Sequence, residues 1–294
     1  MAVRTGTGAD EDPVSRVGVV GAGLMGSGIA EVAARAGASV TFVEPTPDLV
    51  VAGRARIERS LATAVERGKL DADERDAIVR RLTGATELDA LADVDLVVEA
   101  ATEDEAAKVE VFRRLDAVTP PEAILASNTS SIPIARLAAA TDRPDRVIGI
   151  HFFNPPPVMP LVELIPAGST SEDTLGFARA WATSLGKTTV VSRDEAGFIV
   201  NRVLIPFLND AVQLLELGVA TRDDIDTACR LGLAHPMGPL QLADLIGLDT
   251  VAAIGEVLAS ANDDERFGPP AMLRGLVAEG KLGRKSGEGF YRYD

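Results

Sequence analysis

The chain has 294 residues, of which 46% are hydrophobic and 25% charged, and its formal net charge is −15 at pH 7. This balance is typical of a globular protein of about two domains, and the negative charge argues against non-specific binding to nucleic acid or to anionic membranes. The single cysteine excludes an intrachain disulfide, and no stretch is long and apolar enough to span a bilayer. We therefore expect a cytoplasmic protein that has neither nucleic acid nor a membrane as a partner.

The chain opens with a polar segment, residues 1–14, that is rich in glycine and aspartate. Targeting peptides carry an apolar run or a basic amphipathic pattern, and this segment has neither. We expect it to be a disordered tail.

A strand, a turn, a helix and a second strand are the first elements that the pattern predicts. Residues 16–20 form a β-branched run that ends in glycines, a helical pattern covers residues 23–36, and residues 39–43 read as the second strand. This succession is a βαβ unit, whose crossover implies a parallel sheet. Further candidates for buried strands follow at residues 95–99, 123–126, 147–150, 161–165 and 188–191.

Helical patterns fill much of the rest of the chain. A long insertion after the second strand, residues 47–81, reads as two helices with a break near Gly68–Asp71. After about Ser192 the helical candidates are residues 197–217, 222–230, 240–258 and 270–279, and strand patterns are almost absent. We therefore predict an α/β domain with a helical-pair insertion at residues 15–192, followed by an all-α domain at residues 193–294.

A glycine-rich turn, Gly21-Ala22-Gly23-Leu24-Met25-Gly26, lies between the first strand and the first helix. In a G-x-G-x-x-G turn the first glycine permits the tight bend, the second lets a pyrophosphate approach the backbone, and the third lets helix and strand pack closely. Glu44 ends the second strand, where a carboxylate binds ribose hydroxyls and repels a 2′-phosphate. A packing turn and a solvated charge are the alternatives, but the combination favours a Rossmann-type domain that binds NAD rather than NADP.

The chain has two histidines, and His151 ends a predicted strand within the run His151-Phe152-Phe153-Asn154-Pro155. The carboxyl end of a parallel strand is where such sheets place their ligands. Glu163 lies between two apolar residues of the next predicted strand, and a buried carboxylate needs a partner. If the two strands lie side by side, Glu163 can orient His151 as a general acid or base. A structural histidine is the alternative.

Polar residues also follow another predicted strand and interrupt an apolar helix. The run Ser127-Asn128-Thr129-Ser130-Ser131 follows the candidate strand at residues 123–126, and such residues either form a turn or contact a substrate. Asn201 lies in the helical pattern that begins near Gly197, and a buried asparagine must be hydrogen-bonded. The residues alone leave both roles open.

Together, these motifs resemble those of the 3-hydroxyacyl-CoA dehydrogenase family, over about residues 16–294. The matching runs are the glycine turn, Ser127–Ser131, His151–Pro155, Gly197-Phe-Ile-Val-Asn-Arg202, Pro236-Met-Gly-Pro239 and Gly289-Phe-Tyr291. The resemblance implies an NAD-dependent oxidoreductase that interconverts (S)-3-hydroxyacyl-CoA and 3-ketoacyl-CoA, with short-chain substrates such as 3-hydroxybutyryl-CoA. It also implies a homodimer formed through the helical domain.

The resemblance further implies roles for individual residues. His151 takes the hydroxyl proton as hydride leaves the substrate, and Glu163 orients His151. Ser130 and Asn201 hydrogen-bond the substrate. The implied contacts with NAD come from the glycine turn (residues 21–26), Glu44, Glu103, Lys108, Ser130, Asn154 and Lys285. The implied contacts with CoA come from Ser60, Arg67 and Ser130. No metal is expected.

Two of these positions depart from the family pattern. Arg67 stands where lysine is expected, which keeps the charge but changes the geometry of any contact. Glu44 stands where aspartate is common, which puts the ribose contact in doubt. On a helical wheel, Arg56 shares one face with Ser60 and Arg67, so Arg56 joins the candidate CoA contacts in a basic stripe. A solvated face is the alternative.

Three other functions fit parts of the sequence. A β-hydroxyacid dehydrogenase acting on free acids would use a lysine early in the helical domain, where this chain has Asn201-Arg202. A sugar-acid dehydrogenase of the same superfamily would share His151 and Glu163, but the basic stripe argues against it. A catalytically silent NAD-binding protein would not need the site residues that are intact here.

Overall fold

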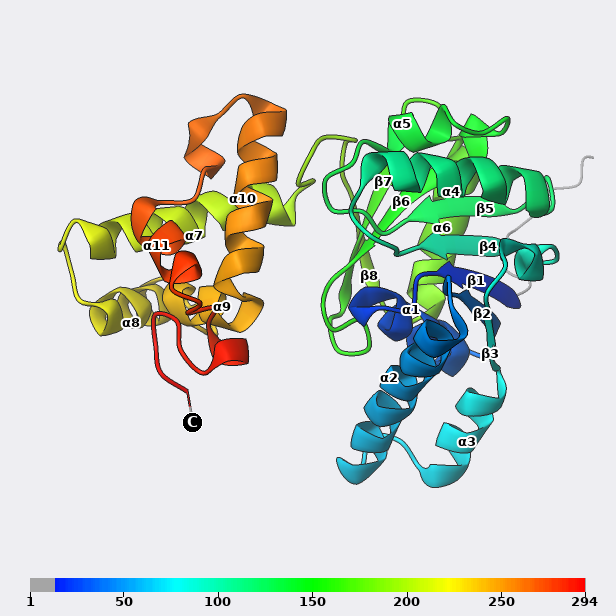
Figure 1. Ribbon diagram of the computed structural model, residues 1–294, viewed down its shortest axis with the longest axis horizontal. Helices are drawn as coiled ribbons and strands as arrows, with labels where there is room; N and C mark the ends of the chain where they lie inside the picture. The colour runs from blue at the N-terminus through cyan, green and yellow to red at the C-terminus, as the bar shows by residue number, and fades with distance from the viewer. Residues whose placement is uncertain (1–13, 294) are drawn as a thin grey trace, which may run out of the picture. The chain divides into compact units, whose positions relative to one another are not determined.

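The computed structural model describes residues 14–293, so the expected N-terminal tail lies outside the described residues except for Val14. The chain divides into two compact units, the first ending at Asp194 and the second beginning at Glu195 (Figure 1). All strands of the described residues belong to the first unit, and the second unit is helical. Across residues 14–293, no helix has both the length and the apolar character needed to cross a membrane.

An eight-stranded sheet forms the centre of the first unit. Its strands are β1 (Arg16–Val20), β2 (Ser39–Val43), β3 (Leu82–Ala85), β4 (Leu96–Glu99), β5 (Ile124–Ser127), β6 (Val147–Phe152), β7 (Leu161–Pro166) and β8 (Thr188–Val191). They are ordered β3-β2-β1-β4-β5-β6-β7-β8, and neighbours are parallel except for the antiparallel pair β6 and β7. The order reverses between β1 and β4, so the glycine turn after β1 lies where such sheets bind nucleotides.

The strand β3 was missing from our sequence-based prediction. It is four residues long, and only Leu82 among them is buried. Neither its length nor an apolar alternation distinguished it from a loop. It pairs with β2 at the edge of the sheet, where one face of a strand need not be apolar. The chain therefore returns to the sheet before it reaches β4.

The helices of the first unit are α1 (Leu24–Arg35), α2 (Pro47–Glu66), α3 (Ala72–Arg80), α4 (Glu105–Val118), α5 (Ile134–Ala138) and α6 (Glu172–Ser184). The expected helical pair is confirmed as α2 and α3. The Thr46 side chain caps α2, the chain turns at Gly68 with φ at 65°, and Asp71 and Glu74 form a capping box at the start of α3. Strong local signals at both ends explain why the sequence indicated this pair.

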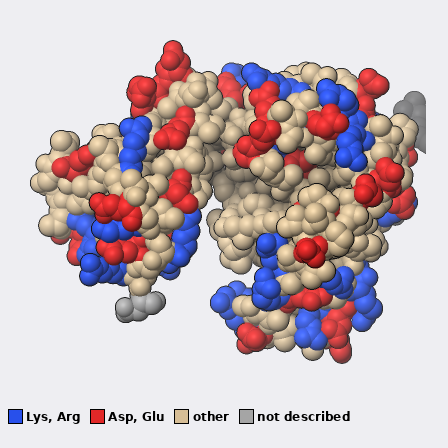
Figure 2. Space-filling view, in the orientation of Figure 1, with Lys and Arg blue, Asp and Glu red and all other residues tan. Residues whose placement is uncertain are grey.

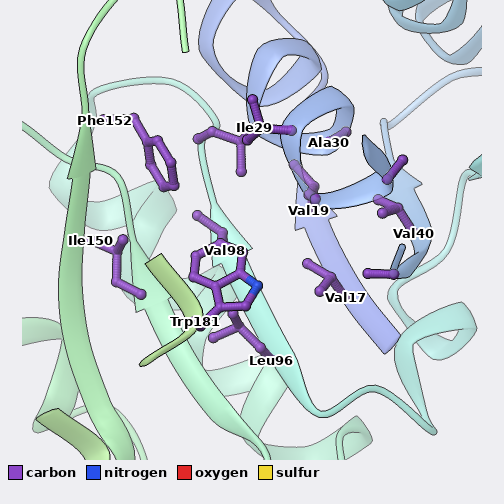
Figure 3. Packing of buried hydrophobic residues seen from close by; sticks show 14 of the residues in the cluster. Val17, Val19, Ile29, Ala30, Val40, Leu96, Val98, Ile150, Phe152 and Trp181 are labelled. Carbon is purple, nitrogen blue, oxygen red and sulfur yellow. The ribbon is translucent and has the colours of Figure 1, made fainter. Parts of the chain in front are cut away.

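A core cluster joins the central strands to the helices that cover them. It includes side chains from β1, β4, β6, α1 and α6, among them Val19, Val98, Phe152, Ile29 and Trp181, each at most 3% exposed (Figure 3). Burial of side chains of this size stabilises a fold by about 1.5–3 kcal/mol each. The cluster fixes the positions of β1, β4 and β6, and with them the polar segments that follow these strands.

The second unit consists of α7 (Val200–Glu216), α8 (Arg222–Gly232), α9 (Pro239–Ile246), α10 (Leu248–Asn262) and α11 (Ala271–Ala278). We expected one helix over residues 240–258, and this was wrong. Gly247 has φ at 104°, a conformation that an α-helix cannot contain, so the chain forms α9 and α10 instead. The apolar pattern continues through the break, which hid it from the sequence.

Two buried aspartates fasten the last described residues to this unit. Asp244 accepts hydrogen bonds from the backbone N–H groups of Phe290 and Tyr291 and from the hydroxyl of Tyr293, each at 2.9 Å. Asp226 accepts a hydrogen bond from the hydroxyl of Tyr291 at 2.8 Å. It also accepts hydrogen bonds from the backbone N–H groups of Leu240 and Gln241, and so caps the first turn of α9. Burial, together with the hydrogen bond to Asp244, raises the pKa of Tyr293 to about 12.

Candidate active site

The glycine turn has room on the side where a pyrophosphate would approach. Gly21 has φ at 87°, and a Cβ there would lie 2.8 Å from the carbonyl oxygen of Ala100. A Cβ on Gly26 would lie 1.7 Å from the oxygen of Gly21, so this glycine allows α1 to pack against the end of β1. By contrast, a Cβ on Gly23 would meet none of the described atoms within 4 Å. Since Gly23 caps α1 without a side-chain hydrogen bond, the first N–H groups of α1 can bind an anion.

Two charged side chains hold the backbone of Ala22 from opposite sides. The N–H of Ala22 donates to Oε1 of Glu44 at 2.5 Å, and the carbonyl oxygen of Ala22 accepts from Arg56 at 3.2 Å. Glu44 therefore joins the end of β2 to the turn, beside the expected ribose position. Arg56, a candidate CoA contact, is hydrogen-bonded to the turn, and its role toward CoA stays a prediction.

A cavity of about 250 Å³ lies between α1, α2 and residues Pro155–Pro157. Arg56 and Ser60 line it from α2, and Glu31 lines it from α1. Burial raises the pKa of Glu31 above its ordinary value, although a hydrogen bond with Ser60 opposes the shift. Arg67 follows the last turn of α2. Figure 2 shows blue side chains, interspersed with red ones, over the part of the molecule that α2 and α3 occupy in Figure 1.

The antiparallel pairing of β6 and β7 places His151 directly opposite Glu163. The two strands therefore lie side by side, as the predicted pairing of His151 with Glu163 required. Nδ1 of His151 is 2.8 Å from Oε2 of Glu163, and the two residues are 7% and 0% exposed. A carboxylate at this nitrogen orients the ring. Nε2 is then the ring atom that can exchange a proton with a substrate.

The Ser127–Ser131 run starts at the last residue of β5 and continues as a turn that is hydrogen-bonded to its surroundings. The N–H of Ser130 donates to Oε1 of Glu103 at 3.0 Å, and the Ser130 hydroxyl lies 3.4 Å from the same oxygen. The side-chain oxygen of Asn128 accepts the N–H of Phe152 at 2.8 Å. The turn is thereby joined to the end of β6, next to the histidine. Its contact with a substrate stays a prediction.

A buried ion pair that the sequence did not reveal contacts the start of this turn through Ser127. Nζ of Lys108 lies 2.7 and 2.8 Å from the two carboxylate oxygens of Glu99, and the residues are 1% and 0% exposed. Nζ also lies 3.5 Å from Glu103. Burial alone would raise the pKa of Glu103, but the charge of Lys108 and the hydrogen bonds from the serine-rich turn lower it. The signal for Glu99 was a carboxylate that ends an apolar strand, comparable to Glu163, which lies inside one.

The remaining candidate contacts lie in different surroundings. Asn154 is exposed after β6, in a segment that Lys187 holds through the carbonyl oxygens of Pro156 and Met159. The other two candidates belong to the second unit. Asn201 is buried on α7, and Nζ of Lys285 forms an ion pair with Asp249 at 2.5 Å. Their roles toward substrate and NAD stay predictions.

Comparisons with known proteins cover nearly the whole chain. Residues 16–195 match the model of the 3-hydroxyacyl-CoA dehydrogenase NAD binding domain, and residues 197–293 match that of the family's C-terminal domain. The chain is 52% identical, over 96% of its length and 99% of the relative's, to the 3-hydroxybutyryl-CoA dehydrogenase of Mycobacterium tuberculosis. It is 44% identical to the human mitochondrial hydroxyacyl-coenzyme A dehydrogenase, over 95% and 91% of the two chains.

A solved structure shows the same arrangement. The (S)-3-hydroxybutyryl-CoA dehydrogenase PaaH1 from Ralstonia eutropha superposes with a TM-score of 0.90 at 43% identity. The similarity covers 96% of this chain and 99% of that one. The sheet, the helical pair and the helical second unit are therefore features of a known fold.

Proposed function

The chain belongs to the 3-hydroxyacyl-CoA dehydrogenase family, and from this premise we propose that it interconverts a short-chain (S)-3-hydroxyacyl-CoA and the corresponding 3-ketoacyl-CoA. It is an NAD-dependent oxidoreductase. The preference for a short chain such as 3-hydroxybutyryl-CoA is supported by the names of the relatives in Mycobacterium tuberculosis and Ralstonia eutropha.

The observation that carries the proposed chemistry is the His151–Glu163 pair at 2.8 Å. Oxidation of a secondary alcohol requires that the hydroxyl proton leave as hydride departs. Bound NAD would supply the hydride acceptor. In the proposed mechanism Nε2 of His151 takes the hydroxyl proton, while Glu163 holds Nδ1 and stabilises the imidazolium that forms. In the reverse direction the imidazolium returns the proton to the substrate oxygen.

The binding residues fit NAD and a CoA thioester. The open side of Gly23 and the first turn of α1 would hold the pyrophosphate, and Glu44 would hold the ribose. We assign the CoA phosphates to the face of α2 that carries Ser60 and Arg67. Ser130 and Asn201 would bind the acyl part of the substrate.

The decisive experiment is a steady-state screen of 3-ketoacyl-CoA substrates of graded chain length, with NADH or NADPH. We expect acetoacetyl-CoA to give the highest kcat/KM and NADH to exceed NADPH. The N-acetylcysteamine thioester of acetoacetate, which lacks the CoA phosphates, is the matched control and should have a higher KM. Activity on free sugar acids without activity on the CoA thioesters would contradict the proposal.

We extend the proposal to a cytoplasmic homodimer formed through the second unit. Several large apolar side chains of that unit are exposed, including Val203 at 68%, Leu217 at 76% and Leu231 at 74%. Large apolar side chains left exposed on one unit indicate a candidate interface between subunits. Light scattering of the parent protein and of Leu231→Glu tests the assembly, and a monomeric parent would contradict it.

A further inference from the structure

We propose that Glu99 and Lys108 are positioning residues for Ser130, acting through Glu103. The inference rests on the proposed function, because it takes Ser130 to be a substrate contact. It concerns the carboxyl ends of β4 and β5 and the first turn of α4. In this region one ammonium group and two carboxylates organise the serine-rich turn.

Each of the two carboxylates holds a different part of that turn. Glu99 accepts the hydroxyl of Ser127 at 2.7 Å, at the point where β5 ends. Glu103 accepts the hydroxyl of Thr129 at 2.6 Å and the N–H of Ser130 at 3.0 Å. The turn is thus attached at its start to one glutamate and at its middle to the other. The position of Ser130 depends on the positions of both.

Lys108 fixes the two glutamates relative to each other. Its Nζ donates to both oxygens of Glu99 and faces Oε2 of Glu103 at 3.5 Å. Oε1 of Glu103 accepts the hydrogen bonds from the turn, whereas Oε2 faces Lys108, so the charge of Lys108 orients this carboxylate. Without the ammonium group, the buried carboxylate of Glu99 and the partly exposed carboxylate of Glu103 would lose the positive charge that they share.

The burial of Lys108 favours this indirect role over direct contact with NAD. The residue is 1% exposed, so a ligand can reach almost none of it in this structure. Burying an ion pair costs several kcal/mol of desolvation per ion, and an apolar pair of similar volume often stabilises a fold as well. A role in positioning the turn explains why charged groups occupy this place.

A double-mutant cycle separates positioning from simple support of the fold. Lys108→Met is expected to lower kcat/KM for acetoacetyl-CoA by about 10- to 100-fold, the scale that a shift of about 1 Å in a substrate contact produces. In a Ser130→Ala background the same substitution should cost less than about threefold, because the contact that it displaces is already gone. Glu103, Lys108 and Ser130 are also candidate NAD contacts, so NADH affinity, measured by fluorescence, should fall as well, but by less than kcat/KM. A full loss in the Ser130→Ala background, or a loss confined to NADH affinity, overturns the proposal.

A second variant addresses the chance that a lone buried charge prevents folding. Glu99→Gln with Lys108→Met removes both charges, so the fold should recover stability while kcat/KM stays low. Parent-like stability together with parent-like kcat/KM in this variant would make the pair merely structural and overturn the proposal. Arg113→Met is the matched control, because Arg113 also lies on α4 but forms an exposed ion pair with Glu110.

A measurement without turnover keeps this test distinct from that of the proposed function. Amide hydrogen exchange of the peptide covering residues 127–133 should be faster in Lys108→Met and unchanged in Arg113→Met. Unchanged exchange in both variants overturns the inference, whatever the substrate is. Absence of parent activity on acetoacetyl-CoA, by contrast, contradicts only the proposed function.

Discussion

Two carboxylates of the same sheet, Glu99 and Glu163, have no exposed surface and different partners. Glu99 binds an ammonium group through both oxygens, at 2.7 and 2.8 Å, whereas Glu163 binds an imidazole nitrogen at 2.8 Å. Near neutral pH an ammonium group is a fixed charge, but an imidazole is the side chain that gains and loses a proton. The distances are nearly equal, so the identity of the partner decides what each pair can do: the first can hold a structure, and the second can also transfer a proton.

The largest expected effect comes from removing the titratable partner. His151→Gln should lower kcat by about 10²-fold or more, because glutamine can bind Glu163 but cannot take up the proton. The measurement is kcat with acetoacetyl-CoA and NADH, and a fluorescence titration with NADH serves as the control for an intact fold. Near-parent turnover in this variant would exclude the proposed mechanism.

Removing one charge of the fixed pair should act on stability. Glu99→Gln leaves the ammonium group of Lys108 buried with one anion fewer, which should lower the free energy of unfolding by about 3–5 kcal/mol. Glu110→Gln, on the exposed face of α4, is the matched control and should cost less than about 1 kcal/mol. Urea unfolding of the two variants gives both values. Equal losses would show that burial does not distinguish the pairs.

Removing the charge of Glu163 while keeping its hydrogen bond sharpens the comparison further. Glu163→Gln should lower kcat by about tenfold, below the full range of general acid–base catalysis because the imidazole remains. The KM for acetoacetyl-CoA and the affinity for NADH should hardly change, since neither ligand is bound by Glu163. Glu163→Leu, which also removes the hydrogen bond, should lose more. A rise in KM without a fall in kcat would be inconsistent with a role through His151.

The smallest effect, and the one that depends on pH, concerns Glu103. Its pKa lies below the ordinary value, so its ionised form stabilises the fold at neutral pH, and this contribution is lost as the pH falls through the lowered pKa. Its side chain is 42% exposed, so Glu103→Gln should cost no more than about 1 kcal/mol at pH 7. Unfolding at a series of pH values should show the two proteins converging in acid. If the difference in the free energy of unfolding grew as the pH fell, the pKa of Glu103 would not be lowered by folding.

The sequence predicted those parts of the fold whose signals are local. The central strands are continuous apolar runs, the glycine turn has a defined spacing, and α2 and α3 have caps at their ends. β3 lacks any such signal, because its four residues are largely exposed at the sheet edge. The break at Gly247 was hidden because apolar residues continue on both sides of it.

The candidate site was predictable only where a residue type is rare or a motif is distinctive. His151 and Glu163 could be paired because they end or interrupt adjacent strand candidates. Glu99 gave a signal comparable to that of Glu163, but its partner Lys108 lies nine residues on, in a helix that the pattern had not placed. Pairing across a strand and the following helix needs a known helix start, and α4 begins only at Glu105.

The fastening of the last described residues sets an order during synthesis. The sheet of the first unit is complete once β8 has been made. In the second unit, the hydroxyl of Tyr293 is made 49 residues after its acceptor Asp244, and that of Tyr291 is made 65 residues after its acceptor Asp226. Domains generally fold as units during synthesis, and the N-terminal domain folds first. Until the last described residues are made, Asp244 lacks the donors from Phe290, Tyr291 and Tyr293, and Asp226 lacks the hydroxyl of Tyr291. A translational pause before Tyr291 would therefore leave the second unit, and not the first, exposed to chaperones and proteases.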